Sequence, residues 1–564
     1  MLRWRSGFCI ALVCLLSFSE AHAQQQYGFR IHLKDKVGAL PLSFSASFLS
    51  ERSLARRVVQ VIDLDESDRP VSPDYLSDIL ATTNGKFHVS SRWMNTCVVL
   101  LEDSNKVLQL NGKPYIDSIK YIAHYSAPLH NRVHLSPKEE VSPQSPANAQ
   151  MRVTGTQAYY GSAYGQTALV NGDYLHDRDY TGKCKLIAVL DNGFSGVNTL
   201  TGFDSLNQNG RLLDQYNFVL HRNDVFSDRY NHGTSALSTM AANMPGNYVG
   251  TAPGAEYVVY VTEDDASEMP IELDNLIAGV ERADSVGADI ISVSLGYNEF
   301  AAPFTGMSYT YTQLDGKTTI VAKAANIAAA KGILFAASAG NEGSSTWNYI
   351  LTPGDADSAI TVGSVDLKGV MAPSSSYGPN AAGVIKPDIC MVGNPAIVLT
   401  TGNNPVGIGG TSFALPQLAG WAACLWQSKP TATPFMIKDA IVRSASNYSN
   451  PGNHIGYGIP DFKLALQYLD VKDVPVIPTS ENLVTVSPNP FENELDVKVY
   501  HAKTGDILLR VVDATGKELY KEKYNRLAGI QHLPVSFASG LIPGVYYLTV
   551  ISAGNTATLP ILKK

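Results

Sequence analysis

The sequence predicts an α/β fold in which helices cover both faces of a mostly parallel sheet. Short apolar runs without polar alternation recur between about residues 155 and 466, as expected of strands buried on both faces. Segments with helical spacing separate these runs, and parallel strands need such crossovers. The expected strands are 186–190, 257–261, 289–293, 332–337 and 359–362, and the expected helices are 270–286, 318–331 and 434–444.

Two smaller modules are expected to flank this core, because 564 residues at about 150 per domain predict three or four modules. Residues 27–125 have their own strand and helix signals and predict a small α+β domain. Residues 483–564 alternate apolar and polar side chains between turn signals, which predicts an antiparallel β-sandwich. Extended connectors separate the modules, with Pro137, Pro143 and Pro146 in the first and Pro475 and Pro478 in the second.

The composition is that of a globular protein, with 45% hydrophobic and 17% charged residues. The formal net charge is -8, and no dense cluster of Lys and Arg occurs along the chain. Proteins that track phosphate backbones need such a cluster. We therefore expect no nucleic-acid partner.

The N-terminus has the layout of a secretory signal. Arg3 and Arg5 precede an apolar stretch over residues 8–18, which is followed by Ala21-His22-Ala23. This order predicts a signal peptide over residues 1–23 and export of the rest. The alternative is a membrane anchor, but the apolar stretch falls short of the roughly 20 residues that span a bilayer.

Four cysteines remain after the predicted cleavage, and their spacing matches neither a disulfide framework nor a zinc site. A disulfide between two of them stays open in an exported protein, although buried thiols are the simpler expectation. They are Cys97, Cys184, Cys390 and Cys424.

Asp191 and His232 are the first two candidates for catalysis. Asp191 directly follows the expected strand 186–190, and open α/β sheets bind ligands at the carboxyl ends of strands. His232 stands in the motif N-H-G-T-S before an expected helix over 234–242, and Gly233 leaves room beside the imidazole for a ligand or another chain. Taken alone, each residue also has a non-catalytic interpretation: Asp191 could be an aspartate in a turn, and His232 could be a polar histidine on the surface.

Asn341 and Ser412 are the other two candidates for catalysis. Asn341 stands in S-A-G-N-E-G after the run 332–337, and its glycines permit a turn that aims the amide away from the sheet. Ser412 stands in G-G-T-S-F-A-L-P before an apolar helix. If Ser412 is the N-cap, Pro416 lies in the first turn, where its missing N–H costs no hydrogen bond. The alternatives are a turn asparagine and a serine that only caps a core helix.

These four residues form a complete set for nucleophilic catalysis. A serine hydroxyl needs an imidazole to take its proton, and the imidazole needs a carboxylate to fix its tautomer and stabilise its charged form. The tetrahedral intermediate needs hydrogen-bond donors at its oxygen, which Asn341 and the start of a helix would supply.

The segments around Asp191, H232-G-T, Asn341 and G410-T-S-F-A-L-P resemble the signature motifs of the subtilisin-like serine proteases, over about residues 155–466. The chain order Asp, His, Ser is also the order in that family. The resemblance implies a catalytic triad of Asp191, His232 and Ser412, with Asn341 in the oxyanion hole. Two positions depart from the family pattern, Asn192 and Phe413, and we expect the Asn192 amide to donate to Asp191. By the same resemblance, Ser294, Gly296 and Gly340 line the cleft and pair with the substrate backbone.

The resemblance also assigns roles to the flanks. Residues 24–150 stand where the family has a propeptide and linker, which would act as an intramolecular inhibitor until it is removed. After a linker over 471–482, residues 483–564 resemble the C-terminal sorting domains of type IX secretion, with S-P-N-P-F and P-G-V-Y-Y-L motifs. The alternative for this tail is a carbohydrate- or substrate-binding β-sandwich.

The sequence predicts a serine endopeptidase whose catalytic domain, residues 151–470, cuts protein or peptide substrates. It would be made as a zymogen, exported through the periplasm, and secreted or held at the cell surface. The alternative is a catalytically silent surface binding protein on the same fold. The resemblance allows structural calcium, but no ligand set can be matched to the family position by position, so no cofactor is assigned. The acidic run Asp63, Asp65, Glu66 and Asp68 is expected to be solvated surface.

Overall fold

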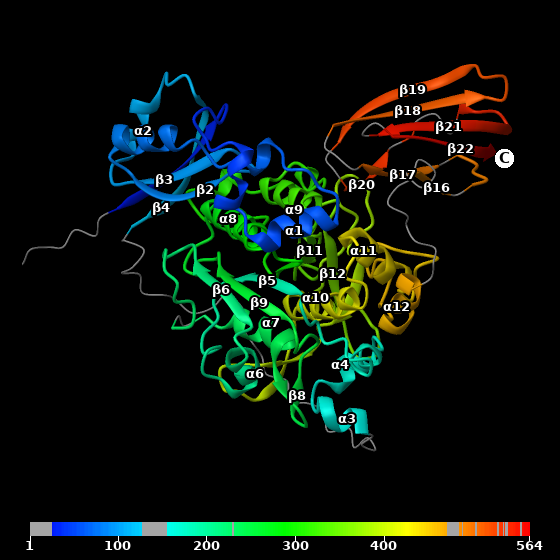
Figure 1. The fold of residues 1–564 in the computed structure, drawn as a ribbon, viewed down its shortest axis with the longest axis horizontal. Helices are drawn as coiled ribbons and strands as arrows, with labels where there is room; N and C mark the ends of the chain where they lie inside the picture. Colours follow the sequence, from blue (N-terminus) through cyan, green and yellow to red (C-terminus); the bar gives the residue numbers. More distant parts are fainter. Residues whose placement is uncertain are drawn as a thin grey trace, which may run out of the picture.

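The computed structural model describes residues 25–126, 155–227, 230–470 and, with short gaps, 484–564. The gaps in the last range are 488, 494, 502–504, 527–528, 534, 536–539 and 553–554. The predicted signal peptide and both proline-rich connectors lie outside the described residues. The described residues form the three modules seen in Figure 1.

The central module contains a seven-stranded sheet in the order β13-β12-β11-β10-β5-β9-β6. All six pairings between neighbouring strands are parallel, which confirms the predicted fold class. Every residue of β5, β10, β11 and β12 is buried, because helices cover both faces of the sheet. The strands are β5 (Leu186–Asp191), β6 (Leu212–Asn217), β9 (Glu256–Val261), β10 (Ile290–Val293), β11 (Leu334–Ser338), β12 (Ile360–Val365) and β13 (Ile389–Val392).

The sequence did not predict β6 and β13, the two edge strands. In β6 only Asn217 is fully buried, since an edge strand is covered on one side only, and its polar residues hide the strand signal. In β13 the four residues are buried, but the run is too short to stand out.

Helices α8 (Ile271–Val286) and α9 (Ile320–Ala330) cover one face of the sheet, and α7 (His232–Ala241) and α10 (Thr411–Ser428) cover the other (Figure 1). Residues 411–426 of α10 are all buried, as expected of a helix that is apolar all round. The remaining elements of this module are α3 (Gly155–Tyr160), α4 (Tyr164–Ala168), α5 (Asp173–His176), α6 (Asp204–Gln208), β7 (Asn243–Met244), β8 (Tyr248–Val249), β14 (Ala396–Leu399), β15 (Pro405–Ile408), α11 (Pro434–Arg443) and α12 (Phe462–Asp470).

The strand order reverses direction at β5. After β5 the chain moves to β6 and β9 on one side, and it then crosses to β10, β11, β12 and β13 on the other. Such a reversal separates the loops that follow neighbouring strands and opens a crevice at their carboxyl ends. The loops after β5, β10 and β11 are therefore positioned to form a site.

The leading module is an antiparallel sheet in the order β2-β3-β1-β4 with two helices, as the α+β prediction required. Some of its buried apolar side chains, such as Val89 and Ile122, belong to the same hydrophobic cluster as those of α8, so the two modules pack on each other. Others, such as Ile79 and Val99, form a separate core within the leading module. The elements are β1 (Gln26–Leu33), α1 (Glu51–Val59), α2 (Pro73–Thr83), β2 (Lys86–Ser91), β3 (Thr96–Leu101) and β4 (Ile116–Tyr125).

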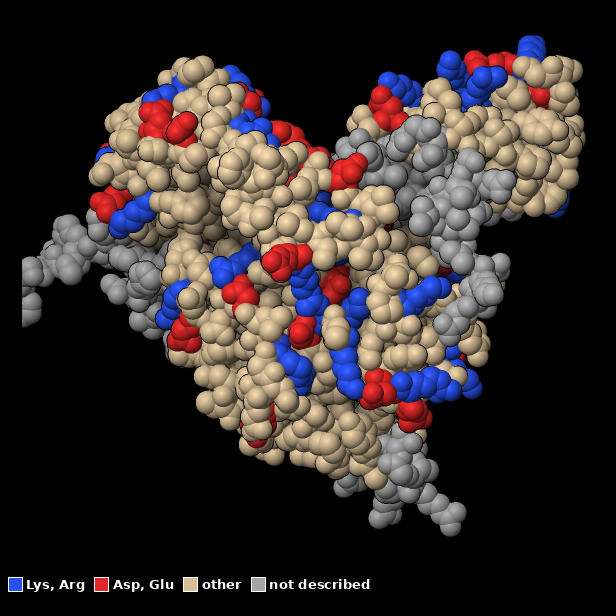
Figure 2. All heavy atoms as spheres, viewed as in Figure 1, with Lys and Arg blue, Asp and Glu red and all other residues tan. Residues whose placement is uncertain are grey.

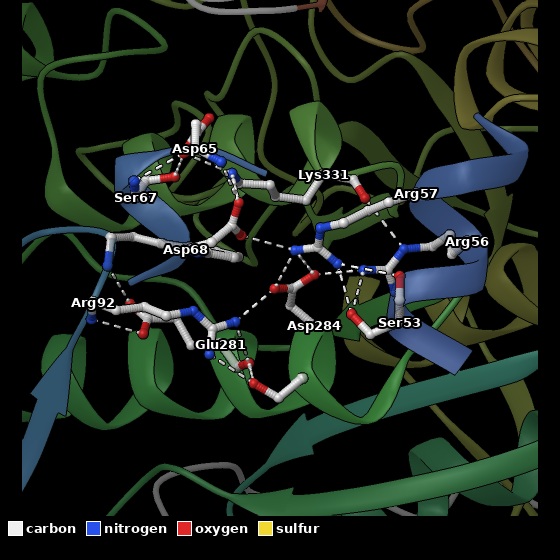
Figure 3. A network of polar contacts seen from close by, with 12 residues as sticks. Ser53, Arg56, Arg57, Asp65, Ser67, Asp68, Arg92, Glu281, Asp284 and Lys331 are labelled. Atoms are coloured by element: carbon white, nitrogen blue, oxygen red, sulfur yellow. Dashed lines mark hydrogen bonds and ion pairs between the residues drawn. The ribbon is translucent and has the colours of Figure 1, made fainter. Parts of the chain in front are cut away.

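The expectation of a solvated acidic run is wrong for Asp68, which is fully buried. Its carboxylate accepts hydrogen bonds from Arg57 of α1 at 3.0 Å and from Lys331, just after α9, at 2.8 Å (Figure 3). Asp65 also accepts from Lys331, at 3.0 Å. Two of the four acidic residues thus hold the leading module against the central one, because a buried carboxylate needs a cation beside it.

The trailing module consists of two antiparallel sheets, with strand orders β16-β17-β20 and β19-β18-β21-β22. Alternate side chains from both sheets, such as Val497, Leu509 and Leu548, form one separate hydrophobic core. This arrangement is the predicted β-sandwich. The strands are β16 (Val484–Ser487), β17 (Asp496–His501), β18 (Gly505–Asp513), β19 (Glu518–Arg526), β20 (Gly529–Leu533), β21 (Gly544–Ser552) and β22 (Asn555–Lys563).

Cys97, Cys390 and Cys424 are buried free thiols, as expected. Cys184 is free but exposed, which corrects the expectation of a buried thiol at that position. Among the described residues, none of the helices combines the length and the apolar character needed to cross a membrane. Acidic and basic side chains are interspersed over the face seen in Figure 2, with neutral areas between them.

Candidate active site

Asp191 and His232 form a hydrogen-bonded pair at the carboxyl end of β5. Asp191 is the last residue of the strand and fully buried, and its Oδ1 lies 2.7 Å from His232 Nδ1. His232 begins α7, and its side chain is 16% exposed. Gly233 makes this approach possible, since a β-carbon there would lie 2.6 Å from the Gly193 carbonyl oxygen and 2.9 Å from Asp191 Cβ. The room beside the imidazole is thus filled by the loop after β5.

Asn192 corrects one expectation about this pair. Its side-chain amide does not donate to Asp191; it donates to Asp265 Oδ2 at 2.8 Å. The backbone N–H of Asn192 donates to Asp191 Oδ1 at 2.8 Å instead. Asp265 lies in the loop between β9 and α8, so Asn192 ties the end of β5 to that loop.

Ser412 lies in the first turn of α10, but it is not the cap. The helix begins at Thr411, with Gly410 as N-cap at a φ of 148°, a value that favours glycine. Pro416 is therefore inside the helix, and it lacks the N–H that would bond to the Ser412 carbonyl. The Ser294 hydroxyl donates to that carbonyl at 2.9 Å, so Ser294 satisfies the group that Pro416 leaves open.

Asn341, which follows β11, is oriented by α10. Its Oδ1 accepts hydrogen bonds from the Thr411 backbone N–H at 3.0 Å and from the Thr411 hydroxyl at 3.1 Å. Its Nδ2 therefore points to the Gly410 side, 3.8 Å from the position of a β-carbon on that glycine. The amide is an N–H donor held beside the helix start that carries Ser412.

The loops after β10 and β11 bring the remaining predicted residues to the same edge. Ser294 follows β10 directly, and the Ser412 hydroxyl lies 3.4 Å from the Ser294 carbonyl oxygen. Gly296 and Gly340 both pack on Leu351, at 2.8 and 2.7 Å from the β-carbon each lacks. Larger residues there would displace the two loops.

All seven predicted residues therefore lie in one cluster at the carboxyl edge of the sheet. The His232 ring lies 5.1 Å from the Phe413 ring, which joins the starts of α7 and α10. Sequence reasoning missed Asp265 and the part that Thr411 takes in holding Asn341. Thr411 adjoins the serine motif and could have been noticed, whereas no local pattern links Asp265 to Asn192.

A buried carboxylate–imidazole pair and a serine at a helix start, gathered at the crevice of a parallel sheet, are typical of hydrolases with an activated serine. The sequence profile of the Subtilase family matches residues 182–458. The chain is 30% identical to Subtilisin NAT of Bacillus subtilis subsp. natto over 296 residues, 52% of this chain and 68% of that protein. It is also 30% identical to Subtilisin of Bacillus pumilus over 296 residues, 94% of that protein. The chain belongs to the subtilase family and is a subtilisin-like serine endopeptidase.

The flanking modules match further families. The profile of the Peptidase S8 propeptide domain of Bacteroidota matches residues 29–139, and that of the secretion system C-terminal sorting domain matches residues 485–564. The leading module is thus a propeptide, and the trailing one is a sorting domain. The protein is a zymogen that is exported, to the medium or the cell surface.

Proposed function

We propose that Ser412 is the nucleophile of this peptidase, His232 its general base and Asp191 the residue that orients His232. The observation that carries this proposal is the 2.7 Å hydrogen bond between His232 Nδ1 and the buried Asp191 carboxylate. It fixes the tautomer whose Nε2 is free of a proton and able to accept one. The contact between the His232 and Phe413 rings supports a position of that imidazole beside Ser412.

In the first step, the Ser412 oxygen attacks the scissile carbonyl while His232 takes the hydroxyl proton. His232 then gives this proton to the leaving amine, and an acyl-enzyme remains on Ser412. Water, deprotonated by His232, releases the second product and restores the serine. Asp191 stays ionised and stabilises the imidazolium in both steps.

The oxyanion is held by Asn341 Nδ2 and the Ser412 backbone N–H. The support for this role is the pair of hydrogen bonds from Thr411, which fix the amide before substrate binds. A fixed donor needs no reorganisation when charge develops, so it favours the transition state over the ground state. Ser294, Gly296 and Gly340 would pair with the backbone of an extended peptide, because they follow β10 and β11 at the same edge.

The propeptide would inhibit the enzyme in cis, and its packing on α8 supports a stable complex. Glu281 of α8 accepts from the backbone N–H groups of Arg92 and Trp93, at 2.9 and 3.1 Å, in the turn between β2 and β3. Asp284 of α8 accepts from three propeptide arginines, Arg56, Arg57 and Arg92 (Figure 3). Mature enzyme would begin near residue 151, after the segment 24–150 is removed.

Export would begin with the signal peptide 1–23, pass through the periplasm and end with recognition of residues 483–564 by the secretion machinery. The substrates are proteins or peptides.

The test uses mass spectrometry of secreted wild-type and Ser412→Ala protein, together with labelling by a fluorophosphonate probe. We expect probe on Ser412 and a cleaved propeptide in the wild type, and neither in Ser412→Ala. Ser344→Ala, which changes an exposed serine near the site, serves as the matched control and should be labelled and processed normally. Probe on another serine, or processing of Ser412→Ala in purified form, would refute the assignment.

A further inference from the structure

Ser294 and Ser412 contact each other at two points in the catalytic cluster. The Ser294 hydroxyl donates to the Ser412 carbonyl oxygen at 2.9 Å, and the Ser412 hydroxyl lies 3.4 Å from the Ser294 carbonyl oxygen. Both residues are buried, with 6% and 4% of their surface exposed. The pair thus joins the residue that follows β10 to the first turn of α10.

The Ser412 carbonyl oxygen needs an outside donor because of Pro416. In a regular helix each N–H bonds to the carbonyl oxygen four residues earlier, and proline has no N–H. Pro416 lies inside α10, four residues after Ser412. The ring of such a proline also pushes against that carbonyl group, and a buried carbonyl oxygen without a partner destabilises the segment that carries it. Ser294 therefore supplies a hydrogen bond that the helix cannot make at this position.

The strand that carries Ser294 is a rigid anchor for this bond. β10 lies between β5 and β11 in the sheet, and all four of its residues are buried. Val293 of β10 pairs with Leu190 of β5 in parallel register. Ser294 and Asp191, the next residues, therefore stand at the same level of two neighbouring strands. The bond from Ser294 to Ser412 fixes the helix start relative to the strand end that carries Asp191.

The residue that is held in this way carries two reacting groups of the proposed mechanism, the hydroxyl of Ser412 and its backbone N–H. A displacement of about 1 Å at a reacting group can lower the rate by about 100-fold. We propose that Ser294 is a positioning residue, whose hydroxyl acts through the Ser412 carbonyl to hold the nucleophile in place for attack. This inference rests on the proposed role of Ser412. It adds a function for the Ser294 side chain, because pairing with substrate uses the backbone of Ser294.

Pro416→Ala provides a rescue that separates this role from a contact with substrate. An alanine at position 416 restores an N–H that can bond to the Ser412 carbonyl oxygen from within the helix. Ser294→Ala removes the hydroxyl and keeps the backbone groups. If the hydroxyl acts through the carbonyl, the double variant should recover what Ser294→Ala alone loses. Ser292→Ala is the matched control, because Ser292 is a fully buried serine of β10 whose hydroxyl has no partner among the described residues.

The wild type, the single variants and the double variant are compared as matured enzymes, with active sites counted by titration with a fluorophosphonate probe. The rate of labelling by the probe reports on the nucleophile, and kcat and KM are measured on a peptide substrate. Ser294→Ala should lower kcat and the labelling rate by about 10- to 100-fold, with KM within about twofold of the wild-type value. The double variant should return to within about threefold of Pro416→Ala, and Ser292→Ala should match the wild type.

Three results would overturn the proposal: unchanged rates in Ser294→Ala, a higher KM at constant kcat, or a double variant as slow as Ser294→Ala. If Ser294→Ala yields no matured enzyme, the double variant must yield it, since it regains the missing hydrogen bond, and failure of both would also overturn the proposal. Label on a serine other than Ser412 in the wild type would overturn the nucleophile assignment as well. Label on Ser412 together with one of the three results would overturn only the role of Ser294.

Discussion

Asp284 accepts hydrogen bonds from three propeptide arginines, and Asp284→Asn tests how far the propeptide complex depends on its charge. Its carboxylate is fully buried and accepts from Arg57 at 2.9 and 3.0 Å and from Arg92 at 2.6 Å, with Arg56 as a third donor. The substitution keeps the shape but removes the charge, which leaves three guanidinium groups without their common counterion.

The size of the effect follows from the environment of this carboxyl. Burial by itself would raise the pKa of Asp284, but the charges of Arg56, Arg57 and Arg92 outweigh it and lower the pKa from 3.8 to about 2. Removing one partner of such a buried ion pair typically costs about 3–5 kcal/mol. We therefore expect propeptide binding to weaken by about 150- to 5,000-fold.

The assay is the inhibition constant of separately added propeptide, residues 24–150, against the mature enzyme and its Asp284→Asn variant. The kcat of the variant should be unchanged, because Asp284 contacts the propeptide and not the cluster around Ser412. Asp214→Asn is the control, since Asp214 pairs with Arg282 inside the catalytic module. An inhibition constant within fivefold of the wild-type value for Asp284→Asn would refute the reasoning.

Three further predictions concern pH, the oxyanion and export. Burial and then the charge of His221 lower the pKa of His88 to about 3 in the complex, whereas a free histidine has about 6.5. His88 must be neutral to bind, so propeptide affinity should be constant above pH 7 and fall about 30-fold by pH 5; equal inhibition at both pH values would contradict this. Asn341→Ala should lower kcat by about 100- to 1,000-fold with KM nearly unchanged, measured on a peptide substrate, and a change in KM alone would argue for ground-state binding. Truncation before residue 483 should abolish appearance outside the cell while cell extracts still label with fluorophosphonate; normal secretion of the truncated protein would argue against a sorting role.

Local sequence pattern was a good guide to the core and to the identity of the cluster residues. The apolar runs around 186–190 and 359–362 became buried strands, because continuous burial on both faces leaves a signal within the segment itself. The four candidate catalytic residues were found in the same way, since each stands at a strand end or a helix start with glycines beside it. The edge strand β6 was missed because its polar side chains face partly outward.

The hydrogen-bond partner of each polar side chain was much harder to predict. The side chain of Asn192 was expected to bond to its neighbour and instead reaches Asp265, and Ser412 was expected to cap a helix that begins one residue earlier. Asp68 was expected in water and is buried between Arg57 and Lys331. In each case the result depends on where a distant segment packs, and a short window of sequence does not contain that segment.

By itself, then, the sequence determined which chemical groups the protein possesses, the parallel sheet that carries them and the order of the three modules. Only the tertiary structure decided which charges compensate one another. Arg57 and Asp284 are 227 residues apart, and Glu263 and Glu272 are brought together by a loop that must turn back onto α8. Buried charges are satisfied at distances of a few ångströms, and folding, not spacing along the chain, sets those distances.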